Sequence, residues 1–240
     1  MPRGRGCVRP QRLSRNNTAR QPEPASSATR SQQPSNRGRK RTAEVPLEDF
    51  VDERVSQTNA DIWVIGDSIP YWAGNHAIQT GKKNLRLPGQ TIAWLGVRGL
   101  RWSTLRREIE AKVLLSPAPS LILIHLGGND LVHSHAYDIK GTIQDEVSYL
   151  HDAFPSACII WIDILPRRVW GKFDNKSMNL KRKRVNRLGR HIVSSLSKFD
   201  IVKPDIDIET AFYREDGVHL NLVGLEFYLD YLRDAMLKNL

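Results

Sequence analysis

The sequence has few cysteines and no long apolar run, and both features exclude certain classes of protein. Only two of the 240 residues are cysteine, Cys7 and Cys158, too few for a disulfide framework or a cysteine zinc site. The longest apolar runs, such as residues 121–126, are far shorter than the roughly 20 residues of a membrane-spanning helix. The N-terminal stretch MPRGRGCVRP has no apolar core of a secretory signal. We therefore expect an intracellular protein, cytoplasmic or nuclear, without a transmembrane segment.

Acidic residues are scarce in the first 50 positions, where four Asp and Glu stand against eleven Lys and Arg. The other 190 residues hold 22 acidic and 25 basic side chains, so the net charge of +10 belongs mainly to the N-terminal segment. That segment also lacks periodic apolar residues, which predicts a disordered basic tail over residues 1–50. Residues 51–240 are then predicted to form one domain of ordinary size.

Two basic clusters are candidates for nucleic-acid contact or for a nuclear signal. They are Arg37, Arg39, Lys40 and Arg41 in the tail, and Lys181, Arg182, Lys183 and Arg184 in a predicted helix. The alternative for the first cluster is a solvated tail without a specific partner. The alternative for the second is the solvated face of an amphipathic helix.

Short apolar runs alternate with longer amphipathic stretches from residue 61 onward. The runs predict strands over residues 61–65, 84–87, 121–126, 157–162 and 200–202. Apolar residues at helical spacing predict helices over residues 91–115, 138–153, 177–198 and 222–239. This alternation predicts a parallel sheet with helices on both faces. Functional groups in such folds gather in the loops at the carboxyl ends of the strands.

The first strand stops at Gly66-Asp67-Ser68, which either ends a strand in a polar turn or presents a serine for chemistry. A serine hydroxyl is a poor nucleophile unless a base takes its proton. His219, in a loop before the last helix, is the candidate base. Asp216, three residues earlier, is the candidate for orienting the imidazole and stabilising its charged form. The sequence therefore predicts Ser68, Asp216 and His219 as catalytic residues.

An oxyanion formed at Ser68 needs hydrogen-bond donors, and the loops after the other strands supply them. The candidates are the backbone N–H groups of Ser68 and Gly89 and the side-chain amide of Asn129. Gly89 follows the predicted strand 84–87, and a glycine there would let the backbone approach a substrate closely. Asn129 follows the third strand in Gly127-Gly128-Asn129-Asp130.

These residues stand in blocks that resemble those of the SGNH (GDSL-type) hydrolase family. The blocks are Ser68 in GDS, Gly89 in LPGQT, Asn129 in GGND and His219 in DGVHLN. The resemblance implies a three-layer α/β/α sandwich with a five-stranded parallel sheet, of flavodoxin-like type. It also implies hydrolysis of an acyl ester, of a small molecule, lipid or carbohydrate, by Ser68, Asp216 and His219, with no cofactor or metal. The G-x-S-x-G nucleophile elbow is absent, because Pro70 stands where that motif needs glycine.

A basic tail joined to such a domain also resembles the esterase domains of some LINE retrotransposon first open reading frames. A second hypothesis of a different class follows from the tail. The domain would be a catalytically weak scaffold, and the basic tail would bind nucleic acid.

Other residues near the strand ends have two interpretations each. Asn129 either caps a turn or donates to an oxyanion, and His219 is either a base or a surface histidine. Asp67 is expected to stabilise the turn or the following helix start, and Asp130 to support the site or cap a segment. Three histidines, His125, His133 and His135, are expected in a pocket wall in preference to a metal site. Three tryptophans, Trp72, Trp94 and Trp170, are expected either in the core or in an acyl pocket.

Overall fold

A computed structural model describes residues 59–240, which alternate between strands and helices along the chain. The elements are β1 (Ile62–Gly66), α1 (Ser68–Gln79), β2 (Ile92–Gly96), α2 (Trp102–Leu115), β3 (Leu121–His125), the 3-10 turn η3 (Asp130–Val132), α3 (Ala136–Ala153), β4 (Cys158–Ile162), α4 (Asn175–Val193), β5 (Phe199–Val202) and α5 (Leu222–Asn239). The predicted tail, residues 1–50, lies outside the described residues.

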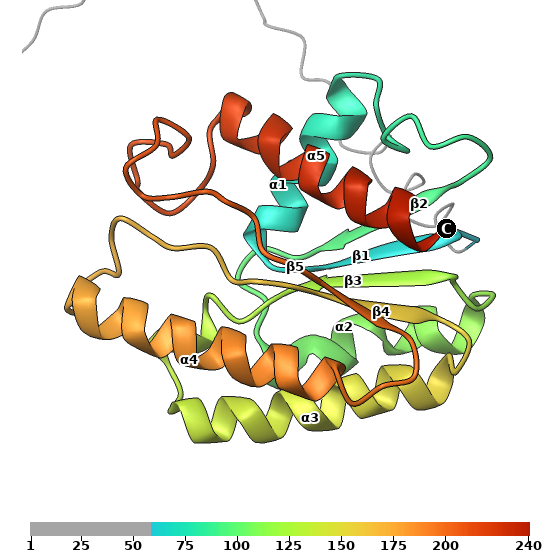
Figure 1. Ribbon diagram of the computed structural model, residues 1–240, viewed down its shortest axis with the longest axis horizontal. Helices are drawn as coiled ribbons and strands as arrows, with labels where there is room; N and C mark the ends of the chain where they lie inside the picture. The colour runs from blue at the N-terminus through green and yellow to red at the C-terminus, as the bar shows by residue number, and fades with distance from the viewer. Residues whose placement is uncertain (1–58) are drawn as a thin grey trace, which may run out of the picture. The chain divides into compact units, whose positions relative to one another are not determined.

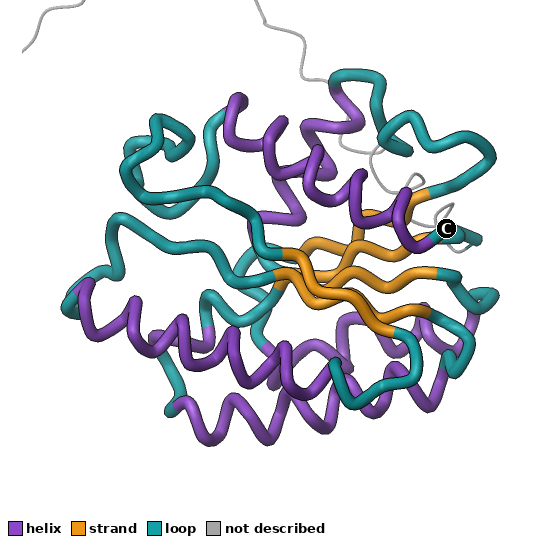
Figure 2. Tube along the Cα trace, viewed as in Figure 1, coloured by secondary structure: helices purple, strands orange, loops and turns teal. Residues whose placement is uncertain are grey.

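The five strands form one parallel sheet in the order β2-β1-β3-β4-β5. The strands lie side by side between two groups of helices (Figure 2). This is the flavodoxin-like order, in which the chain first builds outward from β1 to β2 and then returns to build β3, β4 and β5 on the other side. The reversal leaves a crevice between the carboxyl ends of β1 and β3. The predicted α/β fold with a five-stranded parallel sheet is confirmed.

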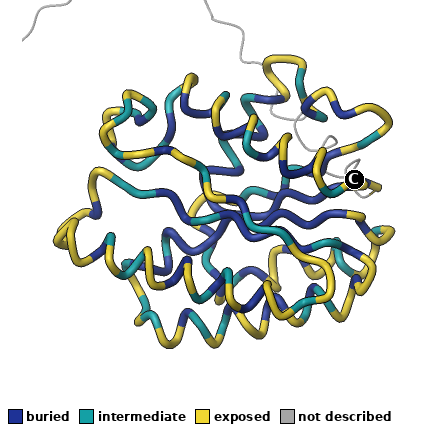
Figure 3. Tube along the Cα trace, in the orientation of Figure 1, coloured by how far each residue is buried: buried dark blue, intermediate teal, exposed yellow. Residues whose placement is uncertain are grey.

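Helices cover both faces of the sheet, and each face has its own apolar core. Helices α1 and α5 lie on one face, and α2, α3 and α4 lie on the other (Figure 1). Alternate residues of one strand serve different cores: Trp63 and Ile65 face α2–α4, whereas Ile62 and Val64 face α1 and α5. Because both faces are covered, the strands are apolar at nearly every position, and the central strands β1 and β3 are buried throughout (Figure 3). The edge strand β5 is only partly buried, and its Phe199 is exposed.

The predicted second strand is wrong. Residues 84–87 form turns, and Leu85 and Arg86 have φ values of 48° and 57°, which an extended strand excludes. The strand is instead β2, and the predicted helix 91–115 splits into β2, a loop and α2. Leu85 and Leu87 are apolar because the turn buries them under α1 and α5, and not because they pair in the sheet.

Helix α1 was not among the predicted helices, since proline and glycine interrupt its sequence SIPYWAGNHAIQ. Pro70 lies in the first turn, where its missing N–H leaves no hydrogen bond unmade. The Asp67 side chain caps the helix by accepting from the Ile69 N–H at 3.1 Å. The expectation that Asp67 stabilises the helix start is confirmed. The other predicted strands and helices lie within a few residues of the observed ones.

Glycines allow helices to lie close to the sheet. A Cβ on Gly189 of α4 would stand 2.3 Å from the Trp161 ring of β4. Trp161 has no space to retreat, because it is fully buried and stacks on Trp102 with ring centroids 5.9 Å apart. The α4–sheet spacing therefore depends on the absence of a side chain at residue 189.

Gly189→Ala should lower the free energy of unfolding by about 1–3 kcal/mol, because the added methyl overlaps the Trp161 ring. Gly141→Ala is the matched control, since Gly141 is also helical but exposed, and its Cβ would meet nothing within 4 Å. That control should stabilise the protein by about 0.5–1 kcal/mol. Urea unfolding measures both values, and equal effects at the two sites would contradict the close packing of α4 on Trp161.

Candidate active site

Ser68 is the first residue of α1 and lies at the carboxyl end of β1, beside the β1–β3 crevice. The turn into it is tight, because the Asp67 N–H donates to the His125 carbonyl at 3.3 Å. A Cβ on Gly66 would stand 2.0 Å from that same oxygen, so the turn requires glycine. Ser68 is 7% exposed and sits at the positive end of the α1 dipole, which favours negative charge developing nearby.

His219 and Asp216 reach Ser68 from the loop between β5 and α5. The His219 Nε2 atom lies 3.0 Å from the Ser68 Oγ atom, and His219 Nδ1 lies 2.8 Å from Asp216 Oδ2. The loop is folded so that Asp216 Oδ1 also accepts the backbone N–H groups of Val218 and His219. The structure thus brings together the three residues predicted as catalytic, from segments 151 residues apart.

Asp216 is ionised at any ordinary pH. Partial burial raises the pKa of this carboxyl, but the hydrogen bonds from the His219 backbone, the His219 ring and the Val218 backbone outweigh that effect and lower it to about 2. A carboxylate accepts hydrogen bonds only, so His219 Nδ1 carries the proton. With this tautomer, an unprotonated Nε2 atom can accept a hydrogen bond from the Ser68 hydroxyl.

Asn129 lies in the loop after β3, on the other side of the crevice. Its Nδ2 atom donates to the Leu100 carbonyl at 3.1 Å, and its Oδ1 atom accepts from Arg167 Nη2 at 3.3 Å. One N–H of the amide remains for another acceptor. The Asn129 side chain makes no capping hydrogen bond to the following 3-10 turn, and it instead joins the β2–α2, β3 and β4–α4 loops.

The placement predicted for Gly89 is wrong. Gly89 precedes β2, and β2 pairs with β1 in parallel from Ile92 opposite Ile62. Gly89 is therefore at the amino edge of the sheet, opposite the edge that carries Ser68. The error follows from the misplaced second strand.

The loop that occupies the expected position is residues 96–100, at the carboxyl end of β2. Gly99 in this loop has a φ of 78° and nothing within 4 Å of where a Cβ would lie. Among the hydrogen bonds within residues 59–240, the backbone N–H groups of Ser68 and Gly99 have no acceptor. The apolar run Ile92–Leu95, followed by Gly96 and Gly99, was the sequence signal for this loop.

Asp130 supports the site by capping α2. Its two carboxylate oxygens lie 3.1 and 3.3 Å from the Trp102 N–H, in the first turn of that helix. Burial is the main influence on this carboxyl and raises its pKa to about 6, against the opposing effect of the Trp102 hydrogen bonds. The cap fixes the start of α2 against the β3 loop, and so helps to hold residues 96–100 beside Asn129.

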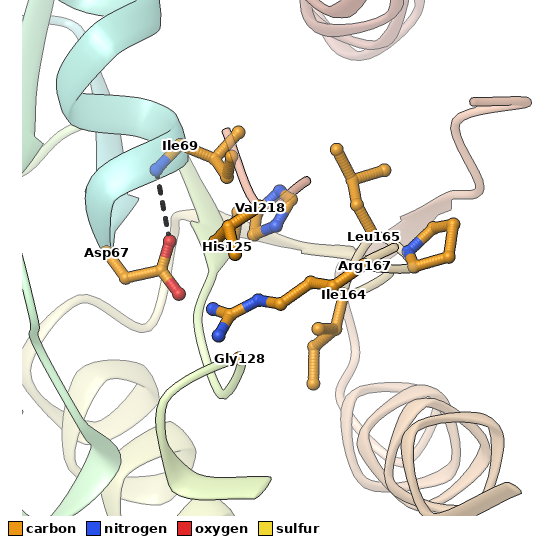
Figure 4. A pocket seen from close by; sticks show the side chains of 9 residues that line it. Asp67, Ile69, His125, Gly128, Ile164, Leu165, Arg167 and Val218 are labelled. Carbon is orange, nitrogen blue, oxygen red and sulfur yellow. Dashed lines mark hydrogen bonds between the residues drawn. The ribbon is translucent and has the colours of Figure 1, made fainter. Parts of the chain in front are cut away.

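A small cavity lies behind Ser68 and has a volume of about 10 Å³, roughly the space of one water molecule. Asp67, His125, Gly128, Arg167 and Val218 are among its lining residues (Figure 4). The Arg167 guanidinium points toward the Asp67 carboxylate across this space (Figure 4).

His125 lies in the wall of this cavity, as expected. Its Nδ1 atom lies 2.9 Å from the Tyr228 hydroxyl, and burial lowers its pKa to about 4, so the ring is neutral. His133 and His135 are exposed. Within residues 59–240, no three His, Cys, Asp or Glu side chains come close enough together to hold a metal ion.

The three tryptophans have different environments. Trp170 is buried in the core, and the Trp94 Nε1 atom donates to the Lys83 carbonyl. Trp72 is half-buried, one helical turn after Ser68, and its ring lies against the guanidinium groups of Arg98 and Arg214.

Two of the four basic residues in α4 have structural roles. Lys181 Nζ donates to the carbonyls of Leu131 and Ser134, and Arg182 Nη1 donates to the Ile164 carbonyl at 2.9 Å. Lys183 and Arg184 are exposed. Nucleic-acid contact by α4 therefore stays a prediction that rests on half of the run. The tail cluster from Arg37 to Arg41 lies outside the described residues.

The fold agrees with comparison to known proteins. The profile of the family described as GDSL-like Lipase/Acylhydrolase matches residues 25–232. The chain belongs to this family. None of the helices within residues 59–240 is long and apolar enough to cross a membrane.

Several relatives of this GDSL-family protein are esterases or lipases by name. A multidomain esterase of Ruminococcus flavefaciens is 25% identical over 166 residues, which cover 67% of this chain and 20% of that protein. The chain thus spans about a fifth of the length of this curated relative. A GDSL-like lipase of Bacteroides thetaiotaomicron superposes with a TM-score of 0.57 at 17% identity, over 80% of this chain and 97% of the other. The esterase EstA of a Pseudoalteromonas species, solved with monoethylphosphonate, gives 0.58 at 16% identity, over 75% and 97%. The resemblance to retrotransposon esterase domains stays a prediction.

Gly99 and Gly89 offer a matched test of which loop supplies the predicted glycine oxyanion donor. Both glycines have positive φ, 78° and 66°, and open space at the Cβ position. Alanine at either site should cost about 1–2 kcal/mol of backbone strain. Gly99→Ala should in addition lower kcat/KM toward an ester by about tenfold or more, because its loop lies at the active edge. Gly89→Ala should change kcat/KM by less than about twofold. Equal losses of activity would contradict this assignment.

The raised pKa of the Asp130 carboxyl predicts that the stability of the protein depends on pH. Its folded-state pKa of about 6 exceeds the ordinary value of 3.8, so between these values the folded protein binds more protons than the unfolded chain. The stability contributed by the neutral carboxyl is present below the ordinary value and is lost as the pH rises through about 6. The loss is on the order of 2–3 kcal/mol.

Asp130→Asn removes this titration and keeps an acceptor for the Trp102 N–H. The unfolding free energy of the wild type, relative to this variant, should therefore fall as the pH rises from about 4 to about 7. Urea unfolding across this range measures the difference. A difference that stays constant with pH would contradict the buried, proton-binding carboxyl.

Proposed function

We propose that this protein hydrolyses acyl esters through a covalent acyl-enzyme on Ser68. The observation that carries the proposal is the continuous chain of contacts from Ser68 Oγ through the His219 ring to Asp216. It supplies a nucleophile, a base within hydrogen-bond reach and a group that orients the base. The family to which the chain belongs supports the same class of reaction.

The first step forms the acyl-enzyme. The Ser68 oxygen attacks the ester carbonyl carbon while its proton moves to His219 Nε2, and the carbonyl π electrons move to oxygen. The Ser68 N–H, the Gly99 N–H and the Asn129 amide donate to that oxyanion. Each such donor contributes about 3–4 kcal/mol to transition-state stabilisation in comparable sites. When the intermediate collapses, the ester C–O bond breaks and His219 donates its proton to the departing alkoxide.

The second step releases the acid. A water molecule loses its proton to His219 and attacks the acyl carbon, and the Ser68 oxygen leaves with the proton from Nε2. Asp216 stays ionised in both steps because its pKa is about 2. Its role is to hold the ring tautomer and to stabilise the imidazolium that forms twice in each cycle.

Ser68→Ala should reduce hydrolysis of short p-nitrophenyl esters by at least about three orders of magnitude, because it removes the nucleophile. Ser103→Ala is the control, since Ser103 is exposed on α2 and has no assigned role. It should retain full activity. Release of p-nitrophenol measures both rates. A folded wild-type protein that hydrolyses none of these esters would overturn the proposed function.

A further inference from the structure

Arg167, in the loop after β4, is half-buried, and its guanidinium lies in the wall of the small cavity beside Asp67 (Figure 4). This loop lies at the same sheet edge as Ser68, but its residues do not take part in the chain of contacts from Ser68 to Asp216. The guanidinium is held in place by its surroundings. It lies 5.0 Å from the centre of the Trp170 ring, and a Cβ on Gly128 would stand 2.4 Å from Nη2. A side chain at residue 128 would therefore displace the guanidinium from this position.

The contact between Arg167 and Asn129 fixes how the Asn129 amide is oriented. A guanidinium only donates, so the atom that it contacts at 3.3 Å must be the amide oxygen. The Leu100 carbonyl only accepts, so the atom that it contacts at 3.1 Å must be the amide nitrogen. These two partners exclude the flipped amide, in which both contacts would be repulsive. The second N–H of Nδ2 is left in one defined direction.

A charged donor on Oδ1 also strengthens the amide as a donor. A hydrogen bond to the carbonyl end of an amide draws electron density away from nitrogen, which makes the remaining N–H more positive. Burial lowers the pKa of Arg167, and the nearby Asp67 charge opposes that change, so the group stays charged at working pH.

We propose that Arg167 is a positioning residue for ester hydrolysis, which orients and polarises the Asn129 amide so that its free N–H donates to the oxyanion. The inference rests on the proposed function and deepens it. Because the oxyanion forms in the transition state, loss of Arg167 should lower kcat and leave substrate binding nearly unchanged.

A merely structural role for Arg167 makes a different prediction. If the guanidinium only neutralised the buried Asp67 carboxylate, its removal would destabilise the fold or disturb α1. The activity would then fall by the same factor whether or not Asn129 were present. A double-mutant cycle between the two residues separates these cases, because it measures the coupling directly.

The experiment compares wild type, Arg167→Met, Asn129→Ala and the double variant on one p-nitrophenyl ester, with kcat and KM measured separately. Arg167→Met should lower kcat by about tenfold or more and change KM by less than about twofold. In the Asn129→Ala background the same substitution should lower kcat by less than about twofold, since the group through which it acts is gone. Circular dichroism and the unfolding temperature show whether each variant is folded.

Arg167→Lys is the second variant, and it carries the test if the methionine variant does not fold. It keeps a charge beside Asp67 but loses the planar fork. It should lose less kcat than the methionine variant, and this loss should also vanish in the Asn129→Ala background. Equal losses in both backgrounds, or a change confined to KM, would overturn the role of Arg167 and leave the proposed function intact. A folded wild type without esterase activity would overturn both.

Discussion

The parallel pairing of β1 with β2 on one side and β3 on the other is the constraint on which the site depends. It aligns Gly66 with Gly96 and with His125, so that three strands end at one edge. The loops that follow then carry Ser68, Gly99 and Asn129 to the same crevice. The close approach of these loops requires glycine at residue 66, because any side chain there would collide with the His125 carbonyl. Without the close β1–β3 approach, the proposed nucleophile and the proposed oxyanion donors would lie on separate surfaces.

The loops of the site are held in place by buried carboxylates, each of which has a hydrogen-bond or charge partner. Asp67 caps α1, Asp130 caps α2, and both carboxylates are almost wholly buried. Burial of a charged group is unfavourable unless hydrogen bonds or an opposite charge compensate for it. Each cap supplies hydrogen bonds, and Arg167 supplies the opposite charge near Asp67. The same contacts that satisfy these groups also fix the loops, so the local stability and the geometry of the site have a common origin.

Most of the fold could be predicted from the sequence, because strands buried on both faces leave continuous apolar runs. The error at residues 84–87 arose because a buried turn can be as apolar as a strand: Leu85 and Leu87 pack under helices without pairing. That error moved the expected glycine donor from Gly99 to Gly89. The position of His219 was predictable from its spacing to Asp216, whereas the Arg167–Asn129 contact depends on how the β4 loop lies across β3. Sequence spacing carries no information about such a contact between distant segments.

The proposed hydrolysis depends on Ser68 as a nucleophile that His219 activates. Mass spectrometry of the protein after reaction with a fluorophosphonate tests it most directly, since the adduct records which oxygen attacked. We predict one phosphonyl group per chain, located on Ser68, and no adduct in a folded His219→Ala variant over the same reaction time. A modification on another residue, or equal labelling of the His219→Ala variant, would contradict it.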